Sequence, residues 1–303
     1  MSRFAIWIRA ARPFSFTGAL VPVFLGTIAA AQGGRFDLLY FIVTSLAVLC
    51  LQAGVNLKSD YDDFANKVDV EGSYGSSGVI LGRLLTPKEV RLGGLVLIGS
   101  GAVLGLLLAV ERGWLVLALG LAGTLIGYSY TSRPFHLKYR GLGVPAVFLV
   151  YGPMLALGAY YIQAQRLALA PLVYSIPVGL LTTAILHAND IRDMSFDRSA
   201  GIATFSLLAG RRAANLLYVG LLLGAYLALP IMVAAGALPV WCLASWATFP
   251  LALAAMKKLA GPADSVEKIL GLDQETGKLN SLFSALLLAA LIFSFFVPWS
   301  VAL

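Results

Sequence analysis

The chain alternates between long apolar runs and short polar stretches. Runs of about 20 residues are long enough to cross the hydrocarbon core of a bilayer as helices. The pattern predicts nine membrane-spanning helices, at 14–33, 38–58, 92–110, 113–130, 143–163, 168–188, 214–235, 238–256 and 280–301. Because the runs lack period-two alternation and lipid does not tolerate a free sheet edge, strands are not expected. We therefore predict an all-α, polytopic membrane protein, with residues 1–303 forming one bundle and one domain.

Composition agrees with this setting. Hydrophobic residues make up 59% of the chain and charged residues 12%, whereas soluble domains have about 25% charged residues. The net charge of +7 is spread over short loops, which argues against nucleic acid and suits contact with anionic lipid headgroups. Cys50 and Cys242 lie in apolar runs and are expected to behave as small hydrophobic residues. No protein partner can be inferred.

Charge predicts the orientation of the bundle. All Lys and Arg except Arg35, Arg112 and Arg166 lie at the N-terminus or in loops after even-numbered spans. By the positive-inside rule, these segments face the cytoplasm across the cell (inner or plasma) membrane, and the C-terminus faces outward. Asp and Glu follow the same division except for Asp37 and Glu111. This concentration predicts a functional site capped by the cytoplasmic loops.

The acidic residues cluster in two short stretches. The first contains Asn56, Asp60, Asp63 and Asp69, and the second contains Asn189, Asp190, Asp193 and Asp197. Spacings of three and four residues place Asn56, Asp60 and Asp63 on one face if the second span continues as a helix. The second stretch repeats this spacing after four further spans, so both should emerge on the same side of the membrane.

Carboxylates this close repel one another unless a cation lies between them. Hard oxygen ligands favour Mg²⁺, which binds a few carboxylates together with substrate phosphate oxygens. A single cluster would also fit a solvated helix end, but two facing clusters suit a diphosphate held between two Mg²⁺ ions. Asp62 lies off the favoured face, and Asp190 is suited to capping a helix. The expected metal ligands are Asn56, Asp60, Asp63, Asn189, Asp193 and Asp197.

Basic residues near the two clusters are candidates for binding a diphosphate, on which negative charge builds as it leaves. They are Lys58, Lys67, Arg133, Lys138, Arg192 and Arg198. Asp69 adjoins the Gly/Ser-rich stretch 72–78, whose composition is flexible enough to fold over a bound substrate. His136 and His187 each lack a partner at metal-ligand spacing, so we expect packing or hydrogen-bonding roles for them.

The two acidic stretches resemble the aspartate-rich motifs of the UbiA superfamily of intramembrane prenyltransferases. NLKSDYDDFANKVD at 56–69 is similar to the first motif, and NDIRDMSFDRSAG at 189–201 is similar to the second. The nine spans match the nine-helix bundle of that family. Arg12-Pro13, 78–80, 128–134 and 142–143 are most similar to the 1,4-dihydroxy-2-naphthoate polyprenyltransferase branch of menaquinone biosynthesis. This chain has Gly143-Val144 where that branch usually has Gly-Asp.

The resemblance implies a Mg²⁺-dependent enzyme that transfers a polyprenyl group from its diphosphate to an aromatic acceptor. The tail would enter laterally from lipid, Asp60, Asp63, Asp193 and Asp197 would bind Mg²⁺, and Asn56 and Asn189 would orient ligands. Arg12, Asp69, Tyr128 and Tyr130 join the expected substrate-binding residues. The tyrosine rings would stabilise an allylic cation, or else serve as interfacial anchors.

Two other classes of protein remain open. An ion-coupled transporter would place its charges near mid-membrane, whereas the interiors of these spans lack Asp, Glu, Lys and Arg. A lipid-headgroup phosphotransferase would gather its aspartates in one motif. Within the prenyltransferases, 4-hydroxybenzoate, homogentisate, chlorophyllide, haem and glycerol-lipid acceptors also remain possible, and tail length is not determined.

Overall fold

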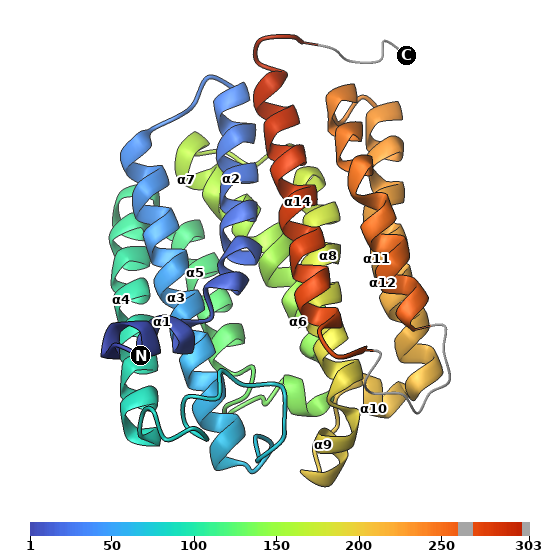
Figure 1. Cartoon of the computed structure of the whole chain (residues 1–303). Helices are drawn as coiled ribbons and strands as arrows, with labels where there is room; N and C mark the ends of the chain where they lie inside the picture. The colour runs from blue at the N-terminus through green and yellow to red at the C-terminus, as the bar shows by residue number, and fades with distance from the viewer. Residues whose placement is uncertain (260–268, 299–303) are drawn as a thin grey trace.

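The structure of the chain is a computed structural model that describes residues 1–259 and 269–298. Within these ranges the chain is helical and contains no strand. The first half comprises α1 (Arg3–Ala11), η1 (Pro13–Ser15), α2 (Phe16–Gln32), α3 (Leu38–Ala65), α4 (Pro87–Arg112), α5 (Trp114–Tyr128), η2 (Lys138–Arg140), α6 (Gly143–Leu149), η3 (Val150–Met154) and α7 (Leu155–Ala164). The second half comprises α8 (Ala170–Arg192), α9 (Met194–Ser199), α10 (Phe205–Ala209), α11 (Arg211–Ala234), η4 (Val240–Thr248), α12 (Phe249–Lys258) and α14 (Leu272–Phe293). The long helices run side by side in one bundle, and α1 lies across them (Figure 1).

The predicted all-α membrane architecture is confirmed, but the count of nine spans is not. Within the described ranges, eight helices are long and apolar enough to cross a membrane. The predicted span 113–130 coincides with α5, which has only 15 residues and falls short of that length. The predicted last span begins earlier, at Leu272, and its end at 299–301 lies outside the described residues.

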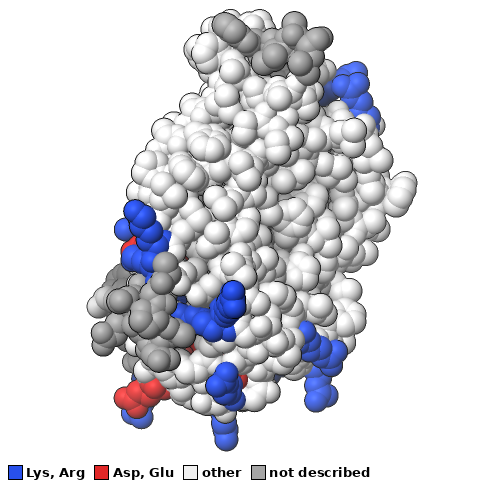
Figure 2. Space-filling view, turned by 90° about the vertical axis from the view of Figure 1, so that its right-hand side faces the viewer, with Lys and Arg blue, Asp and Glu red and all other residues white. Residues whose placement is uncertain are grey.

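The bundle presents an apolar surface to its surroundings. Large exposed side chains along α4 include Leu92, Val96, Val103 and Val110, at 58% to 77% exposure. On the face shown in Figure 2, charged side chains gather toward one end below a broad uncharged band, with a basic group near the opposite end. A soluble protein rarely exposes such an extended apolar surface, so this band is the part that contacts lipid.

Small residues allow neighbouring helices to approach closely. A β-carbon at Gly54 of α3 would lie 2.9 Å from the carbonyl oxygen of Gly94 on α4, and one at Gly94 would lie 3.1 Å from the carbonyl oxygen of Gly54. Because lipid is as apolar as the side chains, such close packing stabilises helix pairs in membranes. It fixes α3, which contains the first acidic motif, against α4.

One predicted span is broken in its middle. The range 143–163 consists of α6, the five-residue π-helical segment η3, and α7. Within η3, Gly152 has φ −104° and ψ −105°, outside the helical region, and Pro153 follows it. A β-carbon at Gly179 of α8 would lie 3.0 Å from Gly152 Cα, so only glycine permits this approach. π-Helical segments of this kind often occur at functional sites.

The two acidic motifs end at the same end of the bundle, with α1, α9 and α10, and the last turn of α14 lies at the opposite end (Figure 1). Helix α3 continues to Ala65, so the first motif is helical as expected. The second motif is not one straight helix, because α8 ends at Arg192 and Asp193 separates it from α9. Asp197 therefore comes from a separate short helix.

Candidate active site

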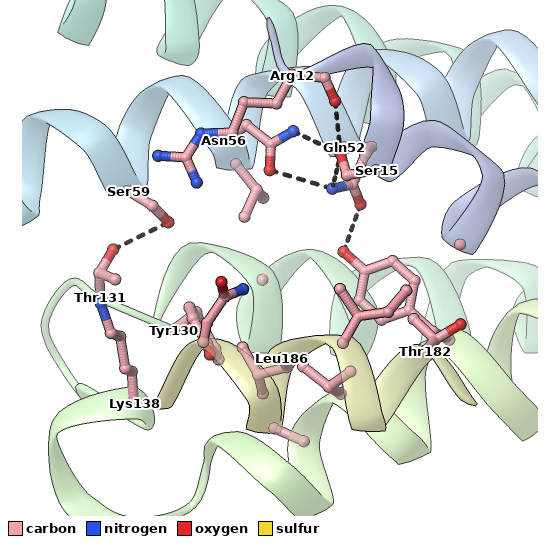
Figure 3. A pocket seen from close by; sticks show the side chains of 18 of the residues that line it. Arg12, Ser15, Gln52, Asn56, Ser59, Tyr130, Thr131, Lys138, Thr182 and Leu186 are labelled. Atoms are coloured by element: carbon pink, nitrogen blue, oxygen red, sulfur yellow. Dashed lines mark hydrogen bonds between the residues drawn. The ribbon is translucent and has the colours of Figure 1, made fainter. Parts of the chain in front are cut away.

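A cavity of about 210 Å³ lies where the two motifs meet. Its acidic and amide lining consists of Gln52, Asn56, Asp63, Asn189, Asp190, Asp193 and Asp197. Figure 3 shows Arg12, Ser15, Gln52 and Asn56 on one wall and Tyr130, Lys138, Thr182 and Leu186 on the facing wall. Residues 133 positions apart, such as Asn56 and Asn189, thus share one cavity.

In the first motif, basic side chains hold the carboxylates. Asp60 is 2% exposed, is not among the residues that line the cavity, and pairs with Arg12. Its other oxygen accepts hydrogen bonds from the Ser77 hydroxyl and, at 3.2 Å, from the Ser77 amide. Asp63 accepts from Lys138 Nζ at 2.9 Å and from the Tyr139 hydroxyl at 2.6 Å.

Asp62 contacts a different part of the chain. It is buried, accepts from Lys58 and Ser132, and accepts from Thr131 Oγ1 at 3.0 Å. It is not among the residues that line the cavity, which agrees with its expected position off the favoured face. Asp62 instead fixes α3 to the loop that follows α5.

In the second motif, Arg192 contacts two acidic residues. Its Nε and Nη2 donate to the two oxygens of Asp193, each at 2.8 Å, and its Nη1 lies 2.8 Å from Asp273 on α14. Asp190 lies within α8 and lines the cavity, so it does not cap a helix and belongs to the acidic wall. Asp190 is not among the site residues expected from the sequence.

Asp197 lines the cavity and has a buried carboxylate oxygen, Oδ2, without a hydrogen-bond partner. Burial and the nearby carboxylates of Asp193 and Asp63 raise the pKa of Asp197 to about 6, although the ammonium of Lys138 opposes the shift. Burial alone would lower the pKa of Lys138, but Asp63 and Asp197 outweigh burial and raise it. Lys138 is therefore a protonated cation between the two motifs.

The lining is chemically suited to Mg²⁺, because carboxylate and amide oxygens are its usual protein ligands. The Oδ2 atom of Asp197 has no hydrogen-bond partner, as expected of an oxygen that is available to bind a metal ion. Among the described residues, no three acidic, His or Cys side chains are already gathered as a metal site. Asp60, Asp63 and Asp193 are held by Arg12, Lys138 and Arg192 instead, so metal binding would require these pairs to separate or to share the carboxylates.

The Gly/Ser-rich stretch 72–78 contacts both motifs. Ser77 bonds to Asp60 of the first motif, and a β-carbon at Gly75 would lie 3.2 Å from Asp193 Oδ2 of the second. The ring of Tyr74 meets that of Phe196 edge-on, with centroids 6.1 Å apart. The stretch therefore covers the polar end of the cavity.

The other expected substrate-binding residues divide into two groups. Arg12, Lys138 and Tyr130 line the cavity, and the Tyr130 hydroxyl is buried without a hydrogen-bond partner. The remainder lie outside the lining: Lys67, Arg133 and Arg198 are exposed, Lys58 and Arg192 are buried in ion pairs, Asp69 bonds to Ser73, and Tyr128 lies 5.2 Å from Lys58 Nζ. Their assigned roles in substrate binding stay predictions.

The two histidines contact protein groups. Buried His187 shares a 2.8 Å hydrogen bond with the carbonyl oxygen of Ala214 and packs edge-on against Phe205. His136 packs edge-on against Tyr139, with centroids 5.5 Å apart. Both contacts agree with the expected packing and hydrogen-bonding roles.

Sequence reasoning missed a second, apolar cavity. It has a volume of about 350 Å³ and is bounded mainly by α3, α4, α5 and α7. It shares with the polar cavity the residues Gln52, Val55, Gly127, Val150 and Tyr151. Gln52 could have been identified from the sequence, because it is a polar residue one helical turn before Asn56. Tyr151 could not, because its position depends on the break in η3.

These features define an integral membrane protein with an acidic cavity that adjoins an apolar one. The UbiA prenyltransferase family matches residues 19–268, and the chain belongs to that family of prenyl-transferring enzymes.

Individual relatives agree along nearly the whole chain. A 1,4-dihydroxy-2-naphthoate octaprenyltransferase from Bacillus subtilis (strain 168) is 29% identical over 285 residues, covering 94% of this chain and 91% of that protein. The UbiA prenyltransferase domain-containing protein 1 of Homo sapiens is 34% identical over 289 residues, covering 92% and 80%. The solved structure of a UbiA homolog from Archaeoglobus fulgidus bound to GPP and Mg²⁺ aligns with a TM-score of 0.65 at 15% identity, covering 95% and 99%. Because the identity is only 15%, this last similarity shows the fold alone.

Proposed function

We propose that this protein transfers a polyprenyl group from a polyprenyl diphosphate to 1,4-dihydroxy-2-naphthoate in quinone biosynthesis. The observation that supports the transfer best is that an acidic and cationic cavity adjoins an apolar one, with five lining residues in common. One substrate with a charged head and a hydrocarbon tail suits both. The name of the Bacillus subtilis relative supports the naphthoate acceptor.

The head of the donor binds between the two motifs. Asp60, Asp63, Asp193 and Asp197, with Asn56 and Asn189, would hold two Mg²⁺ ions, which would neutralise the diphosphate and stabilise it as a leaving group. Arg12 and Lys138 provide the protein's own cations at the cavity wall. Preorganised positive charge at the point where negative charge develops lowers the barrier to reaction.

The tail of the donor occupies the apolar cavity, and its allylic carbon lies at the shared wall. The bond between that carbon and the diphosphate oxygen breaks, and both electrons leave with the diphosphate. An electron-rich ring carbon of the acceptor then forms the new carbon–carbon bond, and the ring becomes aromatic again by losing a proton from that carbon or, at the carboxylate-bearing carbon, carbon dioxide. Tyr130 and Tyr151 line the polar cavity, and their ring faces stabilise positive charge on the allylic carbon.

Water must be kept away from that cation, because it would capture it in place of the acceptor. The apolar lining beyond the shared wall excludes water on one side. The stretch 72–78 covers the polar end. The protein thus provides a space in which the acceptor reaches the allylic carbon with little competition from water.

The test uses purified protein in detergent, Mg²⁺, radiolabelled geranylgeranyl diphosphate and a panel of aromatic acceptors. We expect label to move to the naphthoate and not to 4-hydroxybenzoate. Transfer to the benzoate alone would overturn the acceptor assignment, and no release of diphosphate with any acceptor would overturn the reaction.

Matched variants test the metal-binding residues. Asp60→Asn and Asp193→Asn remove one charge from each motif at constant size, so we expect diphosphate release to fall at least 100-fold, or about 2.7 kcal/mol. Asp37→Asn is the control, because Asp37 caps the far end of α3 and Asn also caps helices. Near-normal turnover in either motif variant would contradict the metal role.

A further inference from the structure

Gln52 occupies the wall that the two cavities share. It lies on α3, one turn before Asn56, and is 8% exposed. Its Nε2 donates to Ser15 Oγ and to Asn56 Oδ1, each at 3.1 Å, and its Oε1 accepts from the Tyr151 hydroxyl. Figure 3 shows Gln52 between Asn56 and Ser15 on the wall of the polar cavity. Both amide hydrogens and the amide oxygen are thus used within the protein.

The hydrogen bonds that Gln52 Nε2 donates, the donor side of the network, help to fix the turn that contains Arg12. Asn56 Nδ2 donates to the Ala11 carbonyl at 2.8 Å and to Ser15 Oγ at 2.9 Å, and Ser15 Oγ donates to the Arg12 carbonyl at 2.9 Å. Arg12 itself has φ 54°, in the left-handed region, which costs free energy for a residue with a β-carbon. The hydrogen bonds from α3 offset that cost and hold the turn in place. The Arg12 guanidinium is thereby held at the cavity wall.

The hydrogen bond that Gln52 Oε1 accepts, the acceptor side of the network, fixes Tyr151. This residue lies in the π-helical segment η3, where the chain departs from helical geometry at the next residue, Gly152. Its ring lines both cavities. Since the hydroxyl donates to Gln52, the ring cannot turn away from the junction without breaking that bond. A buried hydrogen bond of this kind restricts the orientation of the side chain.

We propose that Gln52 is a positioning residue that aligns the Arg12 turn, which binds the head of the donor, with Tyr151, which faces its allylic carbon. The assignment rests on the proposed function. Gln52 touches neither a metal nor the reacting atoms in this role and acts through its two sets of partners. The network joins η1, α3 and η3 into one unit, so head binding and tail placement depend on the same amide.

Neutral substitutions separate the two sides. Ser15→Ala removes one of the two bonds that Gln52 Nε2 donates, together with the Ser15 bonds to Asn56 and to the Arg12 carbonyl, and leaves the Tyr151 bond intact. Tyr151→Phe removes the bond that Gln52 accepts, and Gln52→Leu removes every side-chain bond of Gln52. Gln163→Leu is the control, because Gln163 is similarly buried at 6% exposure but bonds to the backbone of Asp37 at the other end of the bundle. The unfolding midpoint in detergent identifies any variant that loses its fold.

The experiment measures two quantities for each variant. Calorimetry gives the affinity for inorganic pyrophosphate in the presence of Mn²⁺, and a product assay gives the turnover of farnesyl diphosphate. Ser15→Ala removes the three hydrogen bonds of Ser15 Oγ within the network and should lower pyrophosphate affinity about tenfold, while keeping turnover at saturation within twofold. Tyr151→Phe should do the reverse. Gln52→Leu should lower both, and Gln163→Leu neither.

Double variants distinguish positioning from general loosening. If Gln52 acts through its partners, adding Tyr151→Phe to Gln52→Leu should cause no further loss, because the bond is already gone. Adding Ser15→Ala should cause less than the additive loss, because only the Ser15 bonds to Asn56 and to the Arg12 carbonyl remain to be removed. Full additivity, or a Gln52→Leu enzyme that matches Gln163→Leu in both measurements, would overturn the proposal. Pyrophosphate binding requires neither a prenyl tail nor an acceptor, so the measured affinity tests the role of Gln52 even if the proposed prenyl transfer is wrong.

Discussion

Lys138 Nζ lies 2.9 Å from Asp63 Oδ2 and joins the loop after α5 to the end of α3 across 75 residues of sequence. The ammonium group also faces Asp197 and Asp190 of the second motif. Like charges in one cavity require a counter-ion, and here a lysine of the same chain serves as one. A divalent cation would therefore compete with Lys138 for Asp63, whereas a diphosphate would attract both cations.

Lys138→Met should separate these two effects. Without the ammonium, Asp63 is free to bind metal, so Mn²⁺ affinity without diphosphate should rise about tenfold, and pyrophosphate affinity in saturating Mn²⁺ should fall by a similar factor. Titration calorimetry on the purified protein measures both. Lys257→Met, at an exposed position on α12, is the matched control. A parallel fall in both affinities would show that Lys138 instead supports the metal site.

Asp62→Asn should reduce stability rather than alter metal dependence. The substitution leaves buried Lys58 without its ion-pair partner, and breaking such a pair costs about 3 to 5 kcal/mol. Denaturant unfolding in detergent measures the loss. The double variant Lys58→Met, Asp62→Leu should recover much of the stability, because an apolar pair can replace a buried ion pair. A stable Asp62→Asn protein with a raised Mg²⁺ requirement would instead place Asp62 in the metal site.

Apolar periodicity and length predicted the helical bundle well, because in lipid the backbone must satisfy its own hydrogen bonds and helices are the simple solution. The spacing of Asn56, Asp60 and Asp63 likewise led to the helical first motif, since α3 continues to Ala65. Local spacing failed at the second motif. The helix stops at Asp193, and Asp190, expected to cap a helix, lines the cavity.

Which cations reach the cavity could not be read from the sequence. Lys138 and Arg133 lie in the same loop, yet Lys138 lines the cavity and Arg133 is exposed. That choice depends on how the loop folds back on α3, where Asp62 holds Thr131 and Ser132. Tyr151 depends similarly on the close contact between Gly152 and Gly179. These contacts join residues far apart in sequence, so no local pattern records them.

Gly105→Phe should shorten the prenyl tail that the enzyme accepts. Gly105 lines the apolar cavity, and a β-carbon there has no atom within 4 Å, so a ring would occupy space that we assign to the tail. We expect turnover with farnesyl diphosphate within twofold of wild type and turnover with longer donors reduced tenfold or more. Product analysis by mass spectrometry measures both.

The matched control for tail length is Gly99→Phe on the same helix. Gly99 also has open space around its β-carbon position, but it is exposed and absent from the lining of either described cavity. Equal effects of the two substitutions would mean that α4 is simply disturbed. An unchanged donor range in Gly105→Phe would place the tail elsewhere in the bundle.

The orientation of the bundle can be tested with single cysteines in a chain whose Cys50 and Cys242 are replaced by alanine. Glu71→Cys lies in the loop that covers the motifs, and Leu167→Cys lies between α7 and α8, where Leu167 is 63% exposed. Because basic residues keep their loops on the cytoplasmic side, a membrane-impermeant maleimide should label position 167 in intact cells and position 71 only after lysis. Labelling of position 71 in intact cells would instead place the acidic cavity, and with it the entry of diphosphate substrates, on the outer side. The arginines at 35, 112 and 166 would then be the cytoplasmic set, although they are far fewer than the basic residues around the motifs, and the charge bias would have failed to direct insertion.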